Sequence, residues 1–424
     1  MMLKWKSKRR ADFSVPTIVH VTTVDGSLYF LLRNQIHAIK KHGYRVFTIS
    51  APGPWADKLV GEGIPHLAVG FTRKSIAPIK DLIAFIQLIR IFKKNSFTIV
   101  HTHNPKPGFY GQIAAKIAGV PWIVNTVHGY MFHENTPYLK RKIFILMERI
   151  AALCSTKILS QNSEDFRTAV KEKICTREKI IHLGNGIDTN RFNPEKYNEK
   201  MRLKKRLELG IDSTAFVVGF VGRFVREKGI LELFEAVKIL KEKNIPVLLI
   251  MIGPQEKEKR DQISPSEVKK YGIEDLCRFL GFRMDMPEMY SIMDVFVLPS
   301  YREGFPRSAM EATAMKIPCV VSNIRGCREI VFPGENGYLV PTGDPEAIAE
   351  AIEEIFYDPV RRKRMGEKGR EISLLRFDET NIFKKVISLY DDLITRKNDY
   401  KIVSVNQSNE LAMTKQAAKR EKDK

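Results

Sequence analysis

Residues 299–312 read PSYREGFPRSAMEA and place two carboxylates, Glu303 and Glu311, around a Gly-Phe-Pro turn. The turn predicts a helix that begins near Pro306, with Glu303 in the loop before it and Glu311 farther along it. The N–H groups of a helix's first turn have no partner within the helix, so they can bind an anion. Because carboxylates accept hydrogen bonds from vicinal hydroxyls, the stretch predicts a nucleotide-sugar site. From spacing alone, an ordinary surface helix with an acidic N-terminal turn stays the alternative.

A second phosphate-binding candidate lies upstream, in residues 216–229, which read FVVGFVGRFVREKG. The apolar run predicts a strand, and a helix is expected from about residue 230 to 243. Between them Gly222 allows close backbone approach, while Arg223 and Lys228 offer a guanidinium fork and a point charge for two phosphates. The alternative for this loop is a solvated basic turn.

The remaining chain alternates short apolar runs with helical patterns, which predicts α/β architecture with parallel sheets covered on both faces. We expect two domains, because 424 residues exceed what one core usually serves. Expected strands of the first domain are 17–22, 44–50, 97–101, 122–126, 156–160 and 180–183, with helices at 29–41, 108–118 and 138–153. Expected strands of the second are 216–221, 247–252, 278–280, 295–298 and 318–322, with a further helix capped by Asp344.

Two of these motifs in this order give the chain a family resemblance. Glu303 and Glu311 form a Glu-x7-Glu pattern, and residues 222–229 form a Gly-Arg-(x)4-Lys-Gly loop. With both, the chain resembles the retaining glycosyltransferases of the GT-B fold, family 4, over about residues 16–395. Segments 101–108 (HTHNPKPG), 125–129 (NTVHG) and 161–165 (QNSED) resemble the members that build bacterial surface polysaccharides and lipid-linked oligosaccharides.

The resemblance implies a GT-B enzyme whose two Rossmann-like, doubly wound domains face each other across a cleft. It implies a first, acceptor domain over 16–192, a second, nucleotide-sugar domain over 193–377, and a helix over 378–395 that returns to the first domain. Residues 1–15 are a basic arm, and residues 396–424 are polar and expected to be disordered.

In a doubly wound fold ligands bind beyond the carboxyl ends of strands, so residues after strands are the candidates. His128 follows the strand ending at residue 126, and the family uses a histidine in such a place to contact the donor sugar. We predict the catalytic residues His128, Glu303, Arg223 and Lys228; the donor-binding residues Gly222, Gly253, Phe282, Arg283, Gly304, Phe305, Pro306 and Glu311; and, on the acceptor side, Gly26, His103 and Asn185. The His-Thr-His pair that contains His103 fits the end of a core strand equally well.

No metal and no cofactor are expected. The sequence contains no Asp-x-Asp, so Arg223, Lys228 and the helix near Pro306 would neutralise the leaving diphosphate. The family implies retention by a front-face reaction, in which the departing phosphate takes the acceptor's proton. In the family reading the donor is a UDP-sugar, of which Glu303 would hold the sugar and Glu311 the ribose.

Composition bears on the compartment. Five scattered cysteines form neither a zinc spacing nor a disulfide framework, and no apolar run approaches the length of a membrane span. The N-terminal residues lack the apolar core of a signal peptide. These features predict a cytoplasmic enzyme.

The net charge of +21 predicts a polyanionic partner. No zinc-finger or RNA-recognition signature is present, so we expect an anionic membrane surface and no nucleic acid. The arm supports this with Lys4, Lys6, Lys8, Arg9 and Arg10 around Trp5, although a solubilising tail is the alternative. Residues 79–94 predict a helix with a broad apolar face, which either covers a sheet or lies at a lipid interface. The expected acceptor is a saccharide on a polyprenyl diphosphate at the inner face of the cell membrane.

Two other function classes remain open from sequence. A sugar-nucleotide epimerase of GT-B fold would bind the same diphosphate, and a non-catalytic polyanion-binding protein would explain the charge. A nicotinamide dehydrogenase is disfavoured because no G-x-G-x-x-G follows the first expected strand.

Overall fold

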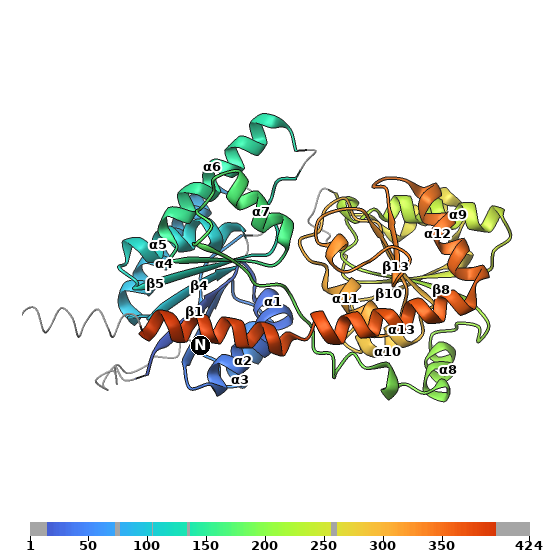
Figure 1. The fold of residues 1–424 in the computed structure, drawn as a ribbon, viewed down its shortest axis with the longest axis horizontal. Helices are drawn as coiled ribbons and strands as arrows, with labels where there is room; N and C mark the ends of the chain where they lie inside the picture. The colour runs from blue at the N-terminus through green and yellow to red at the C-terminus, as the bar shows by residue number, and fades with distance from the viewer. Residues whose placement is uncertain (1–14, 73–76, 104, 134–135, 256–260, 396–424) are drawn as a thin grey trace, which may run out of the picture. The chain divides into compact units, whose positions relative to one another are not determined.

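The computed structural model describes residues 15–72, 77–103, 105–133, 136–255 and 261–395. Contacts divide the chain into two compact units (Figure 1). Unit 1 comprises Met1–Thr126, Met147–Ile158 and Phe383–Lys424, and unit 2 comprises Val127–Leu146 and Leu159–Ile382. The predicted basic arm, except Val15, and the predicted tail lie outside the described residues.

The first sheet has seven strands in the order β3-β2-β1-β4-β5-β6-β7. They are β1 (Thr17–Val21), β2 (Arg45–Ser50), β3 (His66–Ala68), β4 (Ile99–His103), β5 (Trp122–Val127), β6 (Lys157–Ser160) and β7 (Ile180–His182). The pairs of β1 with β2 and with β4, β2 with β3, and β4 with β5 are parallel. Because the chain runs outward from β1 in one direction and from β4 in the other, the sheet has a topological switch point between them.

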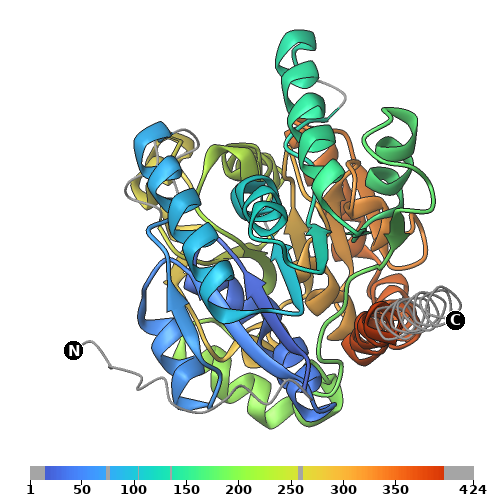
Figure 2. The ribbon, with the colours of Figure 1, turned by 90° about the vertical axis from the view of Figure 1, so that its left-hand side faces the viewer.

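The helical segments between these strands are α1 (Asp25–Ser27), the π-helical η1 (Leu28–Leu32), α2 (Arg33–Lys41), α3 (Pro54–Gly61), α4 (Pro78–Asn95), the π-helical η2 (Pro107–Gly111), α5 (Gln112–Ile117), α6 (Tyr138–Cys154) and α7 (Ser163–Lys171). α4 shows how such a helix forms: Pro78 occupies its first turn, and Ala84, Leu88 and Phe92 are buried on one face. Figure 2 shows α4, in light blue, lying over strands of the first sheet.

The second sheet has six strands in the order β10-β9-β8-β11-β12-β13. They are β8 (Phe216–Val221), β9 (Val247–Ile252), β10 (Cys277–Gly281), β11 (Val295–Leu298), β12 (Cys319–Ser322) and β13 (Gly337–Val340), all in parallel pairs. The main helices are α8 (Glu199–Glu208), α9 (Ile230–Glu242), α10 (Met286–Ser291), α11 (Arg307–Ala314), α12 (Pro345–Tyr357) and α13 (Pro359–Arg376), and residues 379–395 are also helical. Short 3-10 segments are η3 (Pro194–Lys196), η4 (Arg226–Lys228), η5 (Pro265–Tyr271), η6 (Glu274–Leu276) and η7 (Cys327–Glu329).

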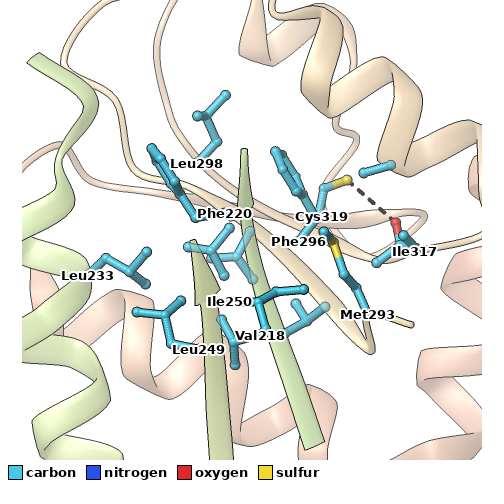
Figure 3. Close-up of a cluster of buried hydrophobic side chains, with 14 of the residues drawn as sticks. Val218, Phe220, Leu233, Leu249, Ile250, Met293, Phe296, Leu298, Ile317 and Cys319 are labelled. Atoms are coloured by element: carbon cyan, nitrogen blue, oxygen red, sulfur yellow. Dashed lines mark hydrogen bonds between the residues drawn. The ribbon is translucent and has the colours of Figure 1, made fainter. Parts of the chain in front are cut away.

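The core of unit 2 explains why its central strands are apolar throughout rather than alternating. Both faces of β8 and β9 are covered, so Val218, Phe220 and Ile250 are fully buried (Figure 3). The Cys319 thiol lies 3.4 Å from the Ile317 carbonyl oxygen in the same cluster, and burial raises the pKa of this thiol to about 12. Such a thiol stays protonated and acts as a small core side chain.

The predicted fold class is confirmed: the protein is α/β, with two parallel doubly wound sheets. The predicted helix near Pro306 is confirmed, because Pro306 precedes α11, and the Asp344 cap is confirmed by a 2.9 Å hydrogen bond from the Ala347 N–H.

Two element bounds were wrong. The helix expected at 29–41 begins at Asp25, whose carboxylate accepts from the Gly26 and Trp55 N–H groups, and it includes the π-helical turn η1. The strand expected at 97–101 lies two residues later, because its pairing with β5 continues to His103. Among the described residues, no helix combines the length and apolar composition that crossing a bilayer requires.

Candidate functional site

Glu303 lies in the loop between β11 and α11 and is held by two side chains. Its Oε1 atom accepts from Lys228 Nζ at 2.5 Å and from Ser300 Oγ at 2.8 Å. The Lys228 and Glu303 side chains are largely buried, with 13% and 11% of their surfaces exposed. The structure therefore joins the two motifs found in the sequence, which are 75 residues apart, in one ion pair.

Backbone packing fixes the same loop from two sides. Gly229 has a positive φ of 68°, and a Cβ atom there would lie 1.9 Å from the Pro299 carbonyl oxygen. The Tyr301 N–H donates to the Glu227 carbonyl oxygen at 2.8 Å. Only a glycine can occupy position 229 without a clash, so the basic loop rests directly on the backbone that precedes Glu303.

Gly304 brings a third segment to the site. A Cβ atom on Gly304 would lie 1.7 Å from the His128 carbonyl oxygen, and one on Gly129 would lie 2.7 Å from Gly304 Cα. Asn162 Nδ2 donates to the Gly304 carbonyl oxygen at 3.0 Å. The backbone after β5 is thus in direct contact with the Glu303 loop, and His128 is placed beside it.

The electrostatics of this contact keep His128 neutral at physiological pH. Burial lowers the His128 pKa to about 4; the hydrogen bond with Gln161 acts in the opposite direction, and the Arg307 charge lowers it further. A neutral imidazole can donate one hydrogen bond and accept another, so it can contact sugar hydroxyls without adding charge.

Glu311 lies on α11 with its carboxylate against Tyr290. The Tyr290 hydroxyl, which is completely buried, donates to Glu311 Oε2 at 3.0 Å. Burial raises the pKa of Glu311, while Arg307 and the Tyr290 hydrogen bond oppose the rise. Because Arg307 stands at the first position of α11, it adds a positive charge where the first-turn N–H groups already favour anions.

The remaining predicted cation, Arg223, is more exposed. Its Nη2 lies 3.2 Å from Glu227 Oε1, and Arg302 makes a second 3.2 Å pair with the other oxygen of Glu227. Burial raises the Glu227 pKa, but Arg302, Lys228 and Arg223 outweigh burial and leave it lowered. Three cationic side chains, Arg223, Lys228 and Arg302, therefore lie around the Glu227 carboxylate, while Arg307 acts on Glu311 at the start of α11.

Gly222 and Gly253 form a second close contact behind this loop. Gly253 has a φ of 149°, and a Cβ atom on it would lie 1.8 Å from the Gly222 carbonyl oxygen. The Gly222 N–H donates to the Ile252 carbonyl oxygen at 2.9 Å. The backbone after β9 can therefore approach the backbone after β8 this closely only because Gly253 lacks a side chain.

The other predicted site residues make mainly local contacts. The Arg283 guanidinium donates two hydrogen bonds to the Asp285 carboxylate, and Phe282 is half exposed. Phe305 is buried, and its carbonyl oxygen accepts from Asn185 Nδ2 at 3.4 Å. Their roles in binding a base or an acceptor stay predictions.

Two acceptor-side candidates lie in unit 1. The Gly26 N–H donates to Asp25 Oδ1 at 2.9 Å. His103 is buried within β4 and shares a 3.0 Å hydrogen bond with His20. The position of His103 is that of a core strand terminus, and its acceptor role stays a prediction.

Sequence reasoning missed several site residues. Tyr290, Arg307 and Asn162 were given no role, although Arg307 and Asn162 lie inside segments that the motifs had singled out. The signal for Arg307 was its place one residue after the helix-opening proline. Tyr290 gave no such signal, since its contact with Glu311 spans 21 positions between two helices.

Among the described residues, one group of histidines has metal-ligand spacing: His20, His101 and His103, all buried. The rings of His101 and His103 stack at 4.2 Å between centroids, and both nitrogens of His101 are engaged by Tyr390 and Thr126. Imidazole lone pairs lie in the ring plane, so stacked rings do not aim them at a common point. The geometry favours a packed histidine cluster over a metal centre.

Comparisons with known proteins identify the family of the chain. The family model described as glycosyl transferases group 1 matches residues 201–372, and the model described as glycosyl transferase 4-like matches residues 18–162. The capsular polysaccharide biosynthesis glycosyltransferase CapM of Staphylococcus aureus is 32% identical over 381 residues, which cover 89% of this chain and 97% of the relative. The chain belongs to the family 4 glycosyltransferases.

Two further comparisons extend the match. The UDP-Gal:alpha-D-GlcNAc-diphosphoundecaprenol alpha-1,3-galactosyltransferase of Escherichia coli is 31% identical over 345 residues, covering 81% of this glycosyltransferase and 88% of the relative. The crystal structure of Anabaena Alr3699/HepE in complex with UDP-glucose superposes with a TM-score of 0.75 at 20% identity, covering 89% of this chain and 99% of that one. The structural likeness establishes the GT-B fold.

Proposed function

We propose that this glycosyltransferase moves a sugar from a UDP-sugar to a saccharide carried on a polyprenyl diphosphate, with retention of anomeric configuration, in the synthesis of a capsular or lipid-linked polysaccharide. The observation that carries the proposal is the Lys228–Glu303 ion pair beside the start of α11. It places a carboxylate for hydroxyls, an ammonium for phosphate and helix N–H groups for a second phosphate within one loop cluster.

The donor would lie along this cluster. Glu303 would accept hydrogen bonds from the sugar hydroxyls, and Glu311 from the ribose. Lys228 has three N–H donors, so it can keep its bond to Glu303 while it donates to a phosphate oxygen. Arg223 and the first turn of α11 would neutralise the rest of the diphosphate.

The reaction follows from these contacts. The bond between the anomeric carbon and the leaving phosphate oxygen breaks, the acceptor oxygen bonds to the same face of that carbon, and the acceptor's proton passes to the departing phosphate. Neutral His128 would stand beside the sugar without repelling the oxocarbenium-like state, since its lowered pKa keeps it uncharged. The cationic side chains and helix N–H groups supply the charge that a divalent cation would otherwise provide, so we propose metal-independent transfer.

The proposed acceptor and location rest on the relatives and on charge. The name of the Escherichia coli relative gives a GlcNAc-diphosphoundecaprenol acceptor, and we propose an acceptor of the same class, which a bilayer would hold, for this chain. The net charge of +21, and the basic residues around Trp5 in the arm, favour peripheral attachment to anionic lipid at the cytoplasmic face.

The test incubates the protein with UDP-, GDP- and ADP-sugars, with and without polyprenyl-diphosphate-linked saccharides. We expect nucleotide release that depends on the acceptor. We also expect NMR of the product to show the same anomeric configuration as in the donor. An isomerised donor would indicate an epimerase instead. If neither a product nor nucleotide release is detected, the remaining interpretation is a non-catalytic polyanion-binding protein.

Variants connect the activity to the site. Glu303→Gln removes the negative charge that Lys228 pairs with, and it should reduce nucleotide release by about two to three orders of magnitude. Glu350→Gln on α12, which makes the same chemical change outside the site, should leave it unchanged. If both variants release nucleotide equally, the Glu303 assignment is wrong.

A further inference from the structure

Helix α6 carries a continuous row of exposed apolar side chains. The row consists of Leu139, Ile143, Leu146, Ile150 and Leu153, which are 72%, 51%, 56%, 41% and 79% exposed. Their spacing alternates between four and three residues, so they project along one side of the helix. We call this set the α6 stripe (Figure 1 shows α6). Single exposed apolar residues are ordinary, but a contiguous stripe of five marks an interaction surface.

The α6 stripe is not the face that holds the helix to the protein. Ile145, Ala151 and Ala152 are buried, and they lie on the opposite side of the helix from the stripe. The fold therefore already uses one apolar face of α6, and the stripe is additional apolar surface that packing does not require.

The charges beside the stripe have one sign. Lys140 on one flank and Lys142 and Arg149 on the other are all exposed. Glu148 is the single acid of the helix, and it lies half-buried on the inward side. An apolar stripe edged by cations matches an anionic lipid surface, because the alkyl stems cover apolar surface while the charged ends reach the headgroups.

A second copy of the chain fits this surface less well. The leucine and isoleucine spacing is typical of a two-stranded coiled coil, but such pairing relies on opposite charges beside the seam. Here the flanking charges are all positive, so two copies of α6 would bring like charges together. The charge pattern thus favours a negatively charged occupant over self-association.

A second helix has a related composition. α4 buries one face, yet Ile79, Leu82, Ile83 and Ile86 on it are exposed by 76%, 57%, 50% and 40%. Exposed Lys80 and Arg90 accompany them. Residues 79–94 had two open interpretations, a sheet-covering helix or an interfacial one, and the structure gives α4 both a buried and an exposed apolar face.

We propose that α6 is a membrane-docking element that lies in the headgroup region of an anionic bilayer with the α6 stripe inserted among the acyl chains. This rests on the proposed function in one respect, since a polyprenyl-linked acceptor would be met at that bilayer. The inference assigns the attachment to α6 rather than to the basic arm alone.

The experiment measures co-sedimentation of the full-length protein with vesicles of phosphatidylcholine, with or without about 30 mol% phosphatidylglycerol. Leu146→Gln/Ile150→Gln should lower the partition coefficient on anionic vesicles by about tenfold or more. The matched control Leu207→Gln/Leu375→Gln changes two side chains that are 80% and 76% exposed on other helices, and it should bind like the unmodified protein.

Two double variants that remove positive charges test the cations beside the α6 stripe separately. Lys142→Gln/Arg149→Gln should weaken binding to anionic vesicles and flatten its salt dependence, whereas Lys363→Gln/Arg364→Gln on α13 should not. Equal binding of the stripe variant and its control, or loss of binding on deletion of residues 1–14 alone, would overturn the proposal. A concentration-dependent dimer that the stripe variant abolishes, without vesicle binding, would identify a second copy as the occupant and overturn it as well.

Activity separates this inference from the proposed function. The stripe variant should keep its turnover on a water-soluble, short-prenyl acceptor and lose it on an acceptor embedded in anionic vesicles. If the unmodified protein transfers sugar to neither acceptor, the proposed function fails, while vesicle binding still decides the role of α6.

Discussion

Replacement of Lys228 and of Arg223 by alanine should have similar effects on turnover and different effects on stability. Lys228 is 13% exposed and pairs at 2.5 Å with a Glu303 side chain that is 11% exposed. Removing one partner of a buried pair costs about 3 to 5 kcal/mol, because the other charge stays buried. Since both side chains keep some contact with water and Ser300 still donates to Glu303, we expect Lys228→Ala to lower the free energy of unfolding by about 2 to 4 kcal/mol.

Arg223 provides the contrast. It is 38% exposed, and its pair with a 30% exposed Glu227 is 3.2 Å long. Exposed pairs contribute about 0 to 1 kcal/mol, so the free energy of unfolding of Arg223→Ala should lie within about 1 kcal/mol of that of the unmodified protein. If both cations meet the leaving diphosphate, each variant should still lose about two to three orders of magnitude in turnover.

Urea unfolding and acceptor-dependent nucleotide release measure the two effects. A double-mutant cycle with Glu303→Gln should show a coupling energy of about 1 kcal/mol or more between positions 228 and 303. The reasoning is refuted if Lys228→Ala and Arg223→Ala lose the same stability, or if Lys228→Ala turns over donor at a near-normal rate.

Three further predictions follow from the same structure. Gly304→Ala should destabilise the protein and abolish turnover, because its Cβ would lie 1.7 Å from the His128 carbonyl oxygen, whereas Gly61→Ala, with nothing within 4 Å, should melt near the unmodified temperature. Acidification from about pH 6.5 to pH 4 should lower the unfolding free energy, since the pKa values of His20 and His128 fall to about 3 and about 4 in the fold while the unfolded side chains bind protons near 6.5; circular dichroism across pH checks this, and constant stability over that range would contradict it. EDTA should leave turnover intact, and complete loss restored by magnesium would show a metal requirement.

Local signals predicted the elements, and long-range packing supplied the site. The start of α11 was predictable because proline is favoured at the beginning of a helix. Strands β8 and β9 were predictable from their apolar runs, because parallel strands are covered on both faces. The Lys228–Glu303 pair was not predictable, since it joins side chains 75 residues apart and both had been given separate roles on the donor. The bounds of β4 were misjudged because pairing with β1 carries the strand to Thr102 and pairing with β5 carries it to His103.

The sequence also does not predict which apolar residues of α6 are exposed. The sequence of α6 is apolar at positions on several sides, and the sequence alone gave only a long helix over residues 138–153. Which apolar residues face inward depends on what packs against the helix. Ile145 and Ala151 turned out to be buried, so the leucines and isoleucines of the stripe became surface.

Backbone contacts rather than side chains fix the position of Glu303, and this has a consequence for variants. Gly304 touches the His128 carbonyl, and a Cβ atom on Gly326, which has a φ of 75°, would lie 2.1 Å from the Gly304 carbonyl oxygen. Asn162 Nδ2 donates a hydrogen bond to that same carbonyl oxygen at 3.0 Å. The loop would therefore keep its course when the Glu303 side chain is changed, while the carboxylate remains able to exchange partners between Lys228 and a ligand. Loss of activity in Glu303→Gln with little change in the loop would follow from this division, in which glycines set the geometry and the ion pair supplies the chemistry.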